Sequence, residues 1–112
     1  MATVDLGKEG EKLAIDYLLA KGYKILERNF RTVFGEIDII ARDKNYIVII
    51  EVKRRLSERF GKAELSVNYK KQERIKKSAL YYVSRLEKEY PVRFDVIAIN
   101  GKEIEHIENA FY

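Results

Sequence analysis

The sequence contains no cysteine and only one histidine. The absence of cysteine excludes a disulfide, a thiolate nucleophile and a cysteine-bound metal, and a lone histidine excludes a cluster of imidazole ligands. Any metal ion that this chain binds must therefore be held by oxygen.

Long apolar runs and linkers are also missing. No stretch approaches the roughly 18 apolar residues of a membrane helix, and the first ten residues lack the layout of a signal peptide. We therefore expect a cytoplasmic protein with no membrane partner. With one proline, no Ser/Gly-rich linker and no internal repeat, residues 1–112 are expected to form a single domain.

Charged residues, by contrast, are abundant. Hydrophobic residues make up 46% of the chain and charged residues 36%, a composition that indicates a soluble globular domain. The net charge of +4 favours an anionic partner such as nucleic acid, although many proteins with this charge bind none.

The first half of the sequence predicts one helix and three strands. Apolar residues recur at helical spacing over residues 7–21, and Gly22 follows as a helix stop. The stretches 23–31, 36–42 and 46–53 have the composition of strands, and the last two are rich in isoleucine and valine.

The second half predicts a long helix over residues 66–89, with Ser66 as its N-cap, and then strands over 93–100 and 102–108 that turn at an Asn-Gly dipeptide. The helix between the third and fourth strands resembles a β-α-β crossover, which makes those two strands parallel, whereas the hairpins are antiparallel. The sequence thus predicts an α/β fold in which helices flank a mixed sheet.

Two carboxylates and a lysine are predicted to meet on one face of the second hairpin. If the chain turns on residues 44–45, cross-strand partners have numbers that sum to 89, so Asp38 lies opposite Glu51. The same sum places Glu36 opposite Lys53. Because side chains alternate along a strand, Asp38, Glu51 and Lys53 share one face. The other face carries aliphatic side chains: Ile37, Ile39, Val48, Ile50 and Val52.

Directly opposed carboxylates repel each other, because their Cβ atoms lie roughly 4.5–5.5 Å apart. A hard divalent cation such as Mg²⁺ would relieve the repulsion and bind a phosphate oxygen. Lys53 could neutralise that phosphate or hold an attacking water, which suits phosphodiester hydrolysis. The alternative is a surface hairpin in which Glu36 pairs with Lys53 and the other two carboxylates face water, and the inferred register could slip by one residue.

The order of these residues resembles a known signature. The segments Gly35-Glu36-Ile37-Asp38 and Glu51-Val52-Lys53 are similar to the split D…EXK signature of the PD-(D/E)XK nuclease superfamily, although Ile37 stands where the motif has proline. A longer set resembles the uncharacterised bacterial YraN-like family: Gly7, Glu11, Ala14, Tyr17-Leu18, Gly22-Tyr23, Arg28-Asn29-Phe30-Arg31, Arg93-Phe94-Asp95-Val96 and Asn109-Ala110-Phe111.

This resemblance implies a restriction-endonuclease-like αβββαβ core and similarity to the archaeal Holliday junction resolvases, which bind Mg²⁺ and cut branched DNA. By position, it implies Glu11, Asp38 and Glu51 as catalytic metal ligands and Lys53 as the catalytic lysine. The implied activity is a Mg²⁺- or Mn²⁺-dependent endonuclease that acts on DNA more readily than RNA, at branched structures. The alternative is a non-catalytic nucleic-acid-binding module. Related resolvases dimerise, so the resemblance allows a homodimer, although no segment identifies an interface.

Basic residues surround this constellation in the sequence. Arg54, Arg55 and Arg59 directly follow Lys53, and we expect them to contact nucleic acid near the metal. Basic residues on the second helix extend the set: Lys70, Lys71, Arg74 and Lys77. A solvated helix face is the alternative for these, and an exposed carboxylate paired with lysines is the alternative for Glu11.

Aromatic residues and the single histidine are expected to be structural. The aromatic side chains expected in or beside the core are Tyr17, Tyr23, Phe30, Phe34, Tyr82, Phe94 and Phe111. Base stacking is the alternative for Phe34 and Phe60, which lie in predicted loops. His106 is expected to pack or to lie at the surface rather than to act in catalysis.

Overall fold

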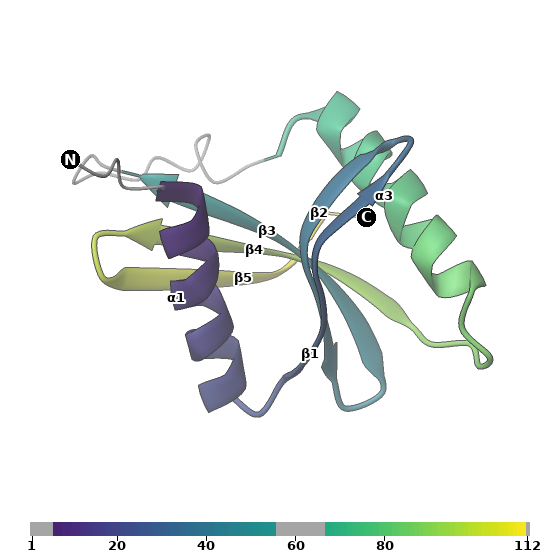
Figure 1. Ribbon diagram of the computed structural model, residues 1–112, viewed down its shortest axis with the longest axis horizontal. Coiled ribbons are helices and arrows are strands. Elements are labelled where there is room, and N and C mark those ends of the chain that lie inside the picture. The colour runs from purple at the N-terminus through teal and green to yellow at the C-terminus, as the bar shows by residue number, and fades with distance from the viewer. Residues whose placement is uncertain (1–5, 56–66, 112) are drawn as a thin grey trace.

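The computed structural model describes residues 6–55 and 67–111 of the chain. Its elements follow the predicted order (Figure 1): α1 (Leu6–Ala20), β1 (Lys24–Thr32), β2 (Gly35–Asp43), β3 (Tyr46–Arg55), α3 (Tyr69–Ser84), β4 (Val92–Asn100) and β5 (Glu103–Phe111). Among the residues described, neither helix has the length and apolar character needed to span a membrane.

The five strands form one sheet in the order β1-β2-β3-β4-β5. All neighbours are antiparallel except β3 and β4, which pair in parallel because the chain crosses over through α3. The mixed sheet predicted from the sequence is therefore confirmed. The predicted Asn-Gly turn joins β4 to β5, where Gly101 has a φ of 64°.

The two helices cover opposite faces of this sheet, as Figure 1 shows. Ala14 and Leu18 of α1 pack on a buried aliphatic layer that includes Ile50, and Ile75 and Ala79 of α3 pack on a second layer on the other face. Because β3 and β4 are covered on both sides, their central residues are apolar without interruption rather than alternating.

The β2–β3 hairpin has the predicted register. Its pairs run from Asp43↔Tyr46 to Ile39↔Ile50, and each pair sums to 89. Beyond Ile39↔Ile50 the backbone ladder stops, and the N–H of Val52 instead donates to the side-chain Oδ2 of Asp38 at 2.8 Å. The two strands thus form a fork, and Asp38 closes its base.

The first half of β2 bends away at this fork, toward α3 (Figure 1). Ile37 belongs to the core layer beneath α3, whereas Ile39 belongs to the layer beneath α1. A regular strand would place both on one face. The prediction that Ile37 shares a face with Ile39, Val48, Ile50 and Val52 is therefore wrong for Ile37, because alternation is interrupted where the strand bends.

Helix α3 is shorter than predicted at both ends. Ser66 lies outside the described residues, and the N-cap is Asn68, whose side chain accepts a hydrogen bond from the N–H of Lys71 at 2.9 Å. The helix ends at Ser84 rather than residue 89, because the chain needs the remaining residues to reach β4, and Pro91 favours an extended residue before it.

The Asn68 cap gives a first testable prediction. Asn68→Ala removes the acceptor for the first turn of α3 and is expected to lower the free energy of unfolding by about 1 kcal/mol. Urea unfolding at neutral pH measures the change, with Asn45→Ala in the β2–β3 turn as the control. An unchanged midpoint for Asn68→Ala would show that the cap contributes nothing to stability.

Candidate metal and phosphate site

The carboxylates predicted to act together lie around the fork between β2 and β3. Glu11 comes from α1, Asp38 from the bend of β2 and Glu51 from β3. Glu11 is only 8% exposed and Glu51 only 7%. The alternative of an exposed, lysine-paired Glu11 is therefore wrong, and the alternative of a surface hairpin is wrong for Glu51.

The electrostatics of Asp38 show that these charges interact. Burial, together with the charges of Glu51 and Glu11, raises the pKa of Asp38 to about 7, and the Val52 hydrogen bond and the Lys71 charge limit the shift. Three acids from three separate elements thus share one electrostatic environment in which negative charge is only partly compensated.

Lys71 supplies part of that compensation. From the first turn of α3 its ammonium forms an ion pair with Oε1 of Glu51. The sequence predicts that Lys71 contacts nucleic acid, and in the structure its ammonium is engaged with a carboxylate of the site instead. The carboxylates of Glu11, Asp38 and Glu51 do not come within 4.8 Å of one another as a set. The Lys71 ammonium therefore occupies the position beside Glu51 that a bound metal ion would take.

Asn29 joins the site from β1, and the sequence reasoning did not single it out as a site residue. With its amide nitrogen turned toward the acids, it donates to Oε1 of Glu11 at 2.6 Å and to Oε1 of Glu36 at 2.8 Å. Its φ of 51° is left-handed, a conformation that asparagine tolerates better than most residues. Glu36 also accepts from Nε of Arg31 at 3.1 Å.

A hollow of about 590 Å³ opens beside these groups. Both acidic and basic side chains line it. The acidic ones are Glu11, Glu36 and Asp38, and the basic ones are Lys8, Arg31 and Arg54. Volumes of this size are typical of ligand sites. Mixed charge in one hollow suits a ligand that brings both an anion and a cation, such as a phosphate with its metal.

Arg54 is the least satisfied of these residues. Within the part of the chain that the structure describes, its Nε and Nη1 are buried and have no hydrogen-bond partner, and its Nη2 lies 3.8 Å from Oε1 of Glu9. Its side chain lies against the first turns of α1, where a Cβ on Gly10 would be only 3.3 Å from its Cδ. Buried donors without acceptors cost about 1–3 kcal/mol each. Because both atoms are closed to solvent, an oxyanion in the hollow would reach them only after the Arg54 side chain turned toward it.

The remaining predicted residues lie around this hollow or away from it. Lys53 is half-buried in β3, two residues beyond Glu51. Lys70, Arg74 and Lys77 are exposed along α3. Arg55 is the last residue of β3, and Arg59 lies outside the described residues.

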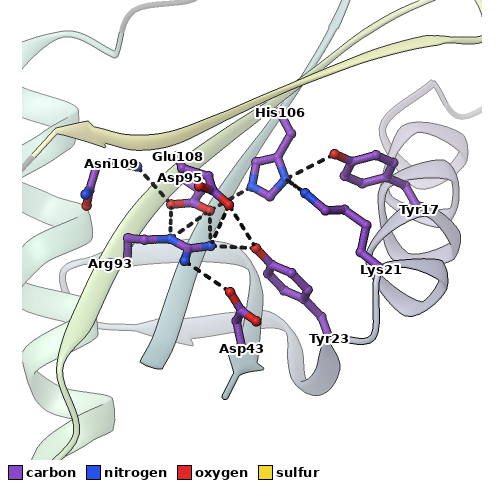
Figure 2. Close-up of polar contacts among 9 residues, drawn as sticks. All are labelled: Tyr17, Lys21, Tyr23, Asp43, Arg93, Asp95, His106, Glu108 and Asn109. Carbon is purple, nitrogen blue, oxygen red and sulfur yellow. Dashed lines mark hydrogen bonds and ion pairs between the residues drawn. The ribbon is translucent and has the colours of Figure 1, made fainter. Parts of the chain in front are cut away.

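A second polar cluster lies on the α1 side of the opposite end of the sheet, and the sequence reasoning missed it (Figure 2). Arg93 donates to both carboxylate oxygens of Asp95, at 2.8 Å and 2.9 Å, and also to Tyr23 and Asp43. Asp95 is completely buried, and Nε2 of His106 lies 2.7 Å from its Oδ2. The signal was a charged pair at alternate positions of an otherwise apolar strand.

The three carboxylates of this second cluster, those of Asp43, Asp95 and Glu108, all pair with Arg93. The hydrogen bonds from His106 and Arg93 outweigh burial and lower the pKa of Asp95, and the carboxylate raises the pKa of Arg93. Asp95, His106 and Glu108 also form the set of possible metal ligands found within 4.8 Å among the described residues. Because the Arg93 guanidinium already occupies both oxygens of Asp95, a second cation would be repelled. We interpret the cluster as structural, so His106 packs as expected but through specific hydrogen bonds.

Comparison with known proteins places the whole chain in one family. The family model of the uncharacterised protein family UPF0102 matches residues 10–99. The chain is 80% identical to a UPF0102 protein of Thermodesulfovibrio yellowstonii over the full length of both. It is 51% identical to a UPF0102 protein of Persephonella marina, covering 94% of this chain and 91% of that protein. A similar match, at 50% identity, is a UPF0102 protein of Syntrophus aciditrophicus.

The raised pKa of Asp38 predicts a dependence of stability on pH. Between its ordinary value of 3.8 and about 7, the folded protein binds more protons at Asp38 than the unfolded chain, so this group lowers stability as pH rises through that window. Asp38→Asn keeps an acceptor for Val52 without the charge. In EDTA it should melt a few degrees above wild type at pH 8, with a smaller gain at pH 5.

Thermal melts at the two pH values measure this difference, with the exposed Asp16→Asn as the matched control. A variant that melts below wild type at pH 8 with chelator present would show that the Asp38 carboxylate is structural, and its metal-site assignment would lose its main support.

The second cluster predicts the opposite behaviour. Asp95→Asn leaves the buried Arg93 without its main counter-charge, and we expect a loss of about 3 kcal/mol, the lower end for a broken buried pair because Asp43 and Glu108 remain near Arg93. Because the folded pKa of Asp95 is lowered, its stabilisation is present above the ordinary pKa and is lost as pH falls. Urea unfolding of the variant at pH 7 and pH 3.5 tests this, and an equal loss at both would contradict it.

Proposed function

Because the chain belongs to the uncharacterised protein family UPF0102, whose description names no activity, we propose its function from the site itself: a metal-dependent nuclease that hydrolyses phosphodiester bonds, in DNA rather than RNA. The observation that carries this proposal is the hollow at the β2–β3 fork. Glu11 and Asp38 line this hollow together with Arg54, whose Nε and Nη1 are unsatisfied, and the charge of Glu51 acts on Asp38.

The donor set fits a hard divalent ion. Three carboxylates offer the oxygen ligands that Mg²⁺ or Mn²⁺ prefers, and the negative charge felt by Asp38 is the kind that such an ion relieves. Glu11, Asp38 and Glu51 would hold it, and Lys71 would leave Glu51 to make room. When bound, the ion supplies a Lewis acid that polarises the phosphate and lowers the pKa of a bound water.

The chain's own residues then bind the substrate and steady its charge. Arg54 lines the hollow, and a turn of its side chain would let the free Nε and Nη1 donate to phosphate oxygens, which arginine matches better than lysine does. Lys53 adds fixed positive charge on the strand that carries Glu51, which stabilises the charge that develops on the phosphate. Val52 holds the Asp38 carboxylate in place through its N–H.

A non-catalytic nucleic-acid-binding module is the second candidate, and the arrangement of the carboxylates favours it. Lys71 already neutralises Glu51, and the three carboxylates are spread more widely than a closed ligand set. In a binding module of this kind, the hollow binds a phosphate without a metal ion. The basic face of α3 and the net charge of +4 suit nucleic acid in either case.

A cleavage assay tests the proposal. Labelled single-stranded, duplex, flap and four-way-junction DNA are incubated with Mg²⁺ or Mn²⁺ and with wild type, Lys53→Ala or Arg54→Ala. We expect cleavage by wild type, a loss of about 100-fold in Lys53→Ala, and in Arg54→Ala a rise in KM of about tenfold. The junction and flap arms test whether branched DNA is preferred, as the resemblance to resolvases suggests.

Lys102→Ala, exposed in the β4–β5 turn, is the matched control and should cleave like wild type. If no substrate is cut but wild type and Lys53→Ala bind DNA equally and with strong salt dependence, the binding module is the correct function. Cleavage that persists unchanged in both site variants would place the activity elsewhere on the protein, or in a contaminant.

A further inference from the structure

The tip of the β1–β2 hairpin is apolar, exposed and firmly held. Val33 is 96% exposed and Phe34 is 40% exposed, so of the positions expected for Phe34 it takes the edge of the domain rather than the core. Thr32 fixes the turn: its hydroxyl accepts from the N–H of Phe34 at 3.0 Å and lies 2.8 Å from the hydroxyl of the buried Ser78 on α3. The tip is thus anchored to the helix rather than free to fold back.

A second hollow, of about 400 Å³, lies between this tip and α3. Phe34 lines it on the hairpin side and Tyr81, 47% exposed, lines it on the helix side. Exposed rings that flank one hollow are unusual on a protein that keeps most large apolar groups inside, and such patches commonly mark interaction sites.

Cations accompany both rings. Lys77 Nζ lies 5.9 Å from the ring centre of Phe34, and the Arg85 guanidinium lies 5.5 Å from that of Tyr81. A purely apolar partner would gain nothing from these charges, whereas a nucleotide offers a flat base for the rings and a phosphate for the cations.

The two hollows adjoin. Arg31, just before the hairpin tip, lines both the hollow at the carboxylates and the hollow at the rings. A strand with a phosphate near Arg54 can therefore continue past Arg31 toward Phe34 and Tyr81. A base inside a duplex has both faces covered by the neighbouring bases. Only an unpaired base can therefore enter between the rings of Phe34 and Tyr81.

We propose that the hollow between Phe34 and Tyr81 binds an unpaired base of the nucleic-acid strand whose phosphate occupies the adjoining carboxylate site. The inference rests on the proposed function for the position of that phosphate, and it names the substrate class: single-stranded segments, and junctions or flaps that expose unstacked bases. Intact duplex offers no base to this hollow and is bound through its phosphates alone.

Binding in EDTA tests the inference without cleavage. Fluorescence anisotropy compares a labelled oligo-dT 15-mer with a 15-base-pair duplex for wild type, Phe34→Ala, Tyr81→Ala and the control Tyr69→Ala, which removes an exposed tyrosine of α3 outside the hollow. We expect Phe34→Ala and Tyr81→Ala to weaken single-strand binding about tenfold, the size of one lost stacking contact, and to leave duplex binding within about twofold.

A base analogue supplies a readout that a folding defect cannot imitate. A 2-aminopurine in the single-stranded part of a flap should lose fluorescence when wild type or Tyr69→Ala binds, and should stay bright with Phe34→Ala at saturating protein. Equal quenching by all variants would overturn the inference. So would a dimer in sedimentation that Phe34→Ala converts to a monomer without any change in DNA binding, since the surface would then join two copies of the chain.

Failure of the proposed nuclease function gives a different pattern. In that case no DNA is cleaved with Mg²⁺ or Mn²⁺, yet the single-strand preference and the quenching still depend on Phe34 and Tyr81. The converse result is cleavage that requires Lys53 while all ring variants bind and quench like wild type. That result would support the nuclease function and overturn the inference that the hollow binds a base.

Discussion

The hydrogen bond from the backbone of Val52 to the carboxylate of Asp38 is the constraint on which the rest of the site depends. It ends the β2–β3 ladder after Ile39↔Ile50 and lets the two strands separate while both stay ordered. The fork opens the hollow, and the bend of β2 carries the β1–β2 hairpin over to α3, where Thr32 meets Ser78. The Asp38 side chain, which replaces a backbone acceptor, is thus linked both to the hollow proposed to hold an ion and to the position of the neighbouring rings.

The two polar clusters of the molecule follow opposite electrostatic designs. Around Asp95, each charge has a partner, and the pKa values of Arg93 and Asp95 move in the directions that favour the charged forms. Around Asp38, burial and the charges of Glu51 and Glu11 act in the same direction, and its pKa moves toward the neutral form. The first arrangement suits a structural role, whereas a raised carboxyl pKa beside other acids is a common property of functional sites and supports the proposed one. This contrast separates structure from function more clearly than burial does, because both clusters are buried.

Much of the fold could be predicted because its signals are local. A two-residue turn predicted the register that the structure shows from Asp43↔Tyr46 to Ile39↔Ile50, and the crossover helix indicated a mixed sheet flanked by helices. The missed features depend on tertiary contacts. The bend that moves Ile37 to the other layer, the left-handed Asn29 beside Glu11, and the pairing of Lys71 with Glu51 each join elements distant in sequence. No single stretch of sequence carries a sign of them.

The parallel pairing of β3 with β4 also sets when the carboxylates of the site come under repulsion. The β2–β3 hairpin can form early from neighbouring residues, whereas Ile47 must find Val92 across the whole crossover, a closure that is slow because the loop is long. Until α1 and α3 dock, Asp38 and Glu51 remain in water and their repulsion is weak. We expect this electrostatic cost to arise late in folding, with the helices, and a φ value near zero for Asp38→Asn is its kinetic signature. On that order of events, the unfavourable charges of the site slow folding little and act mainly on the rate of unfolding.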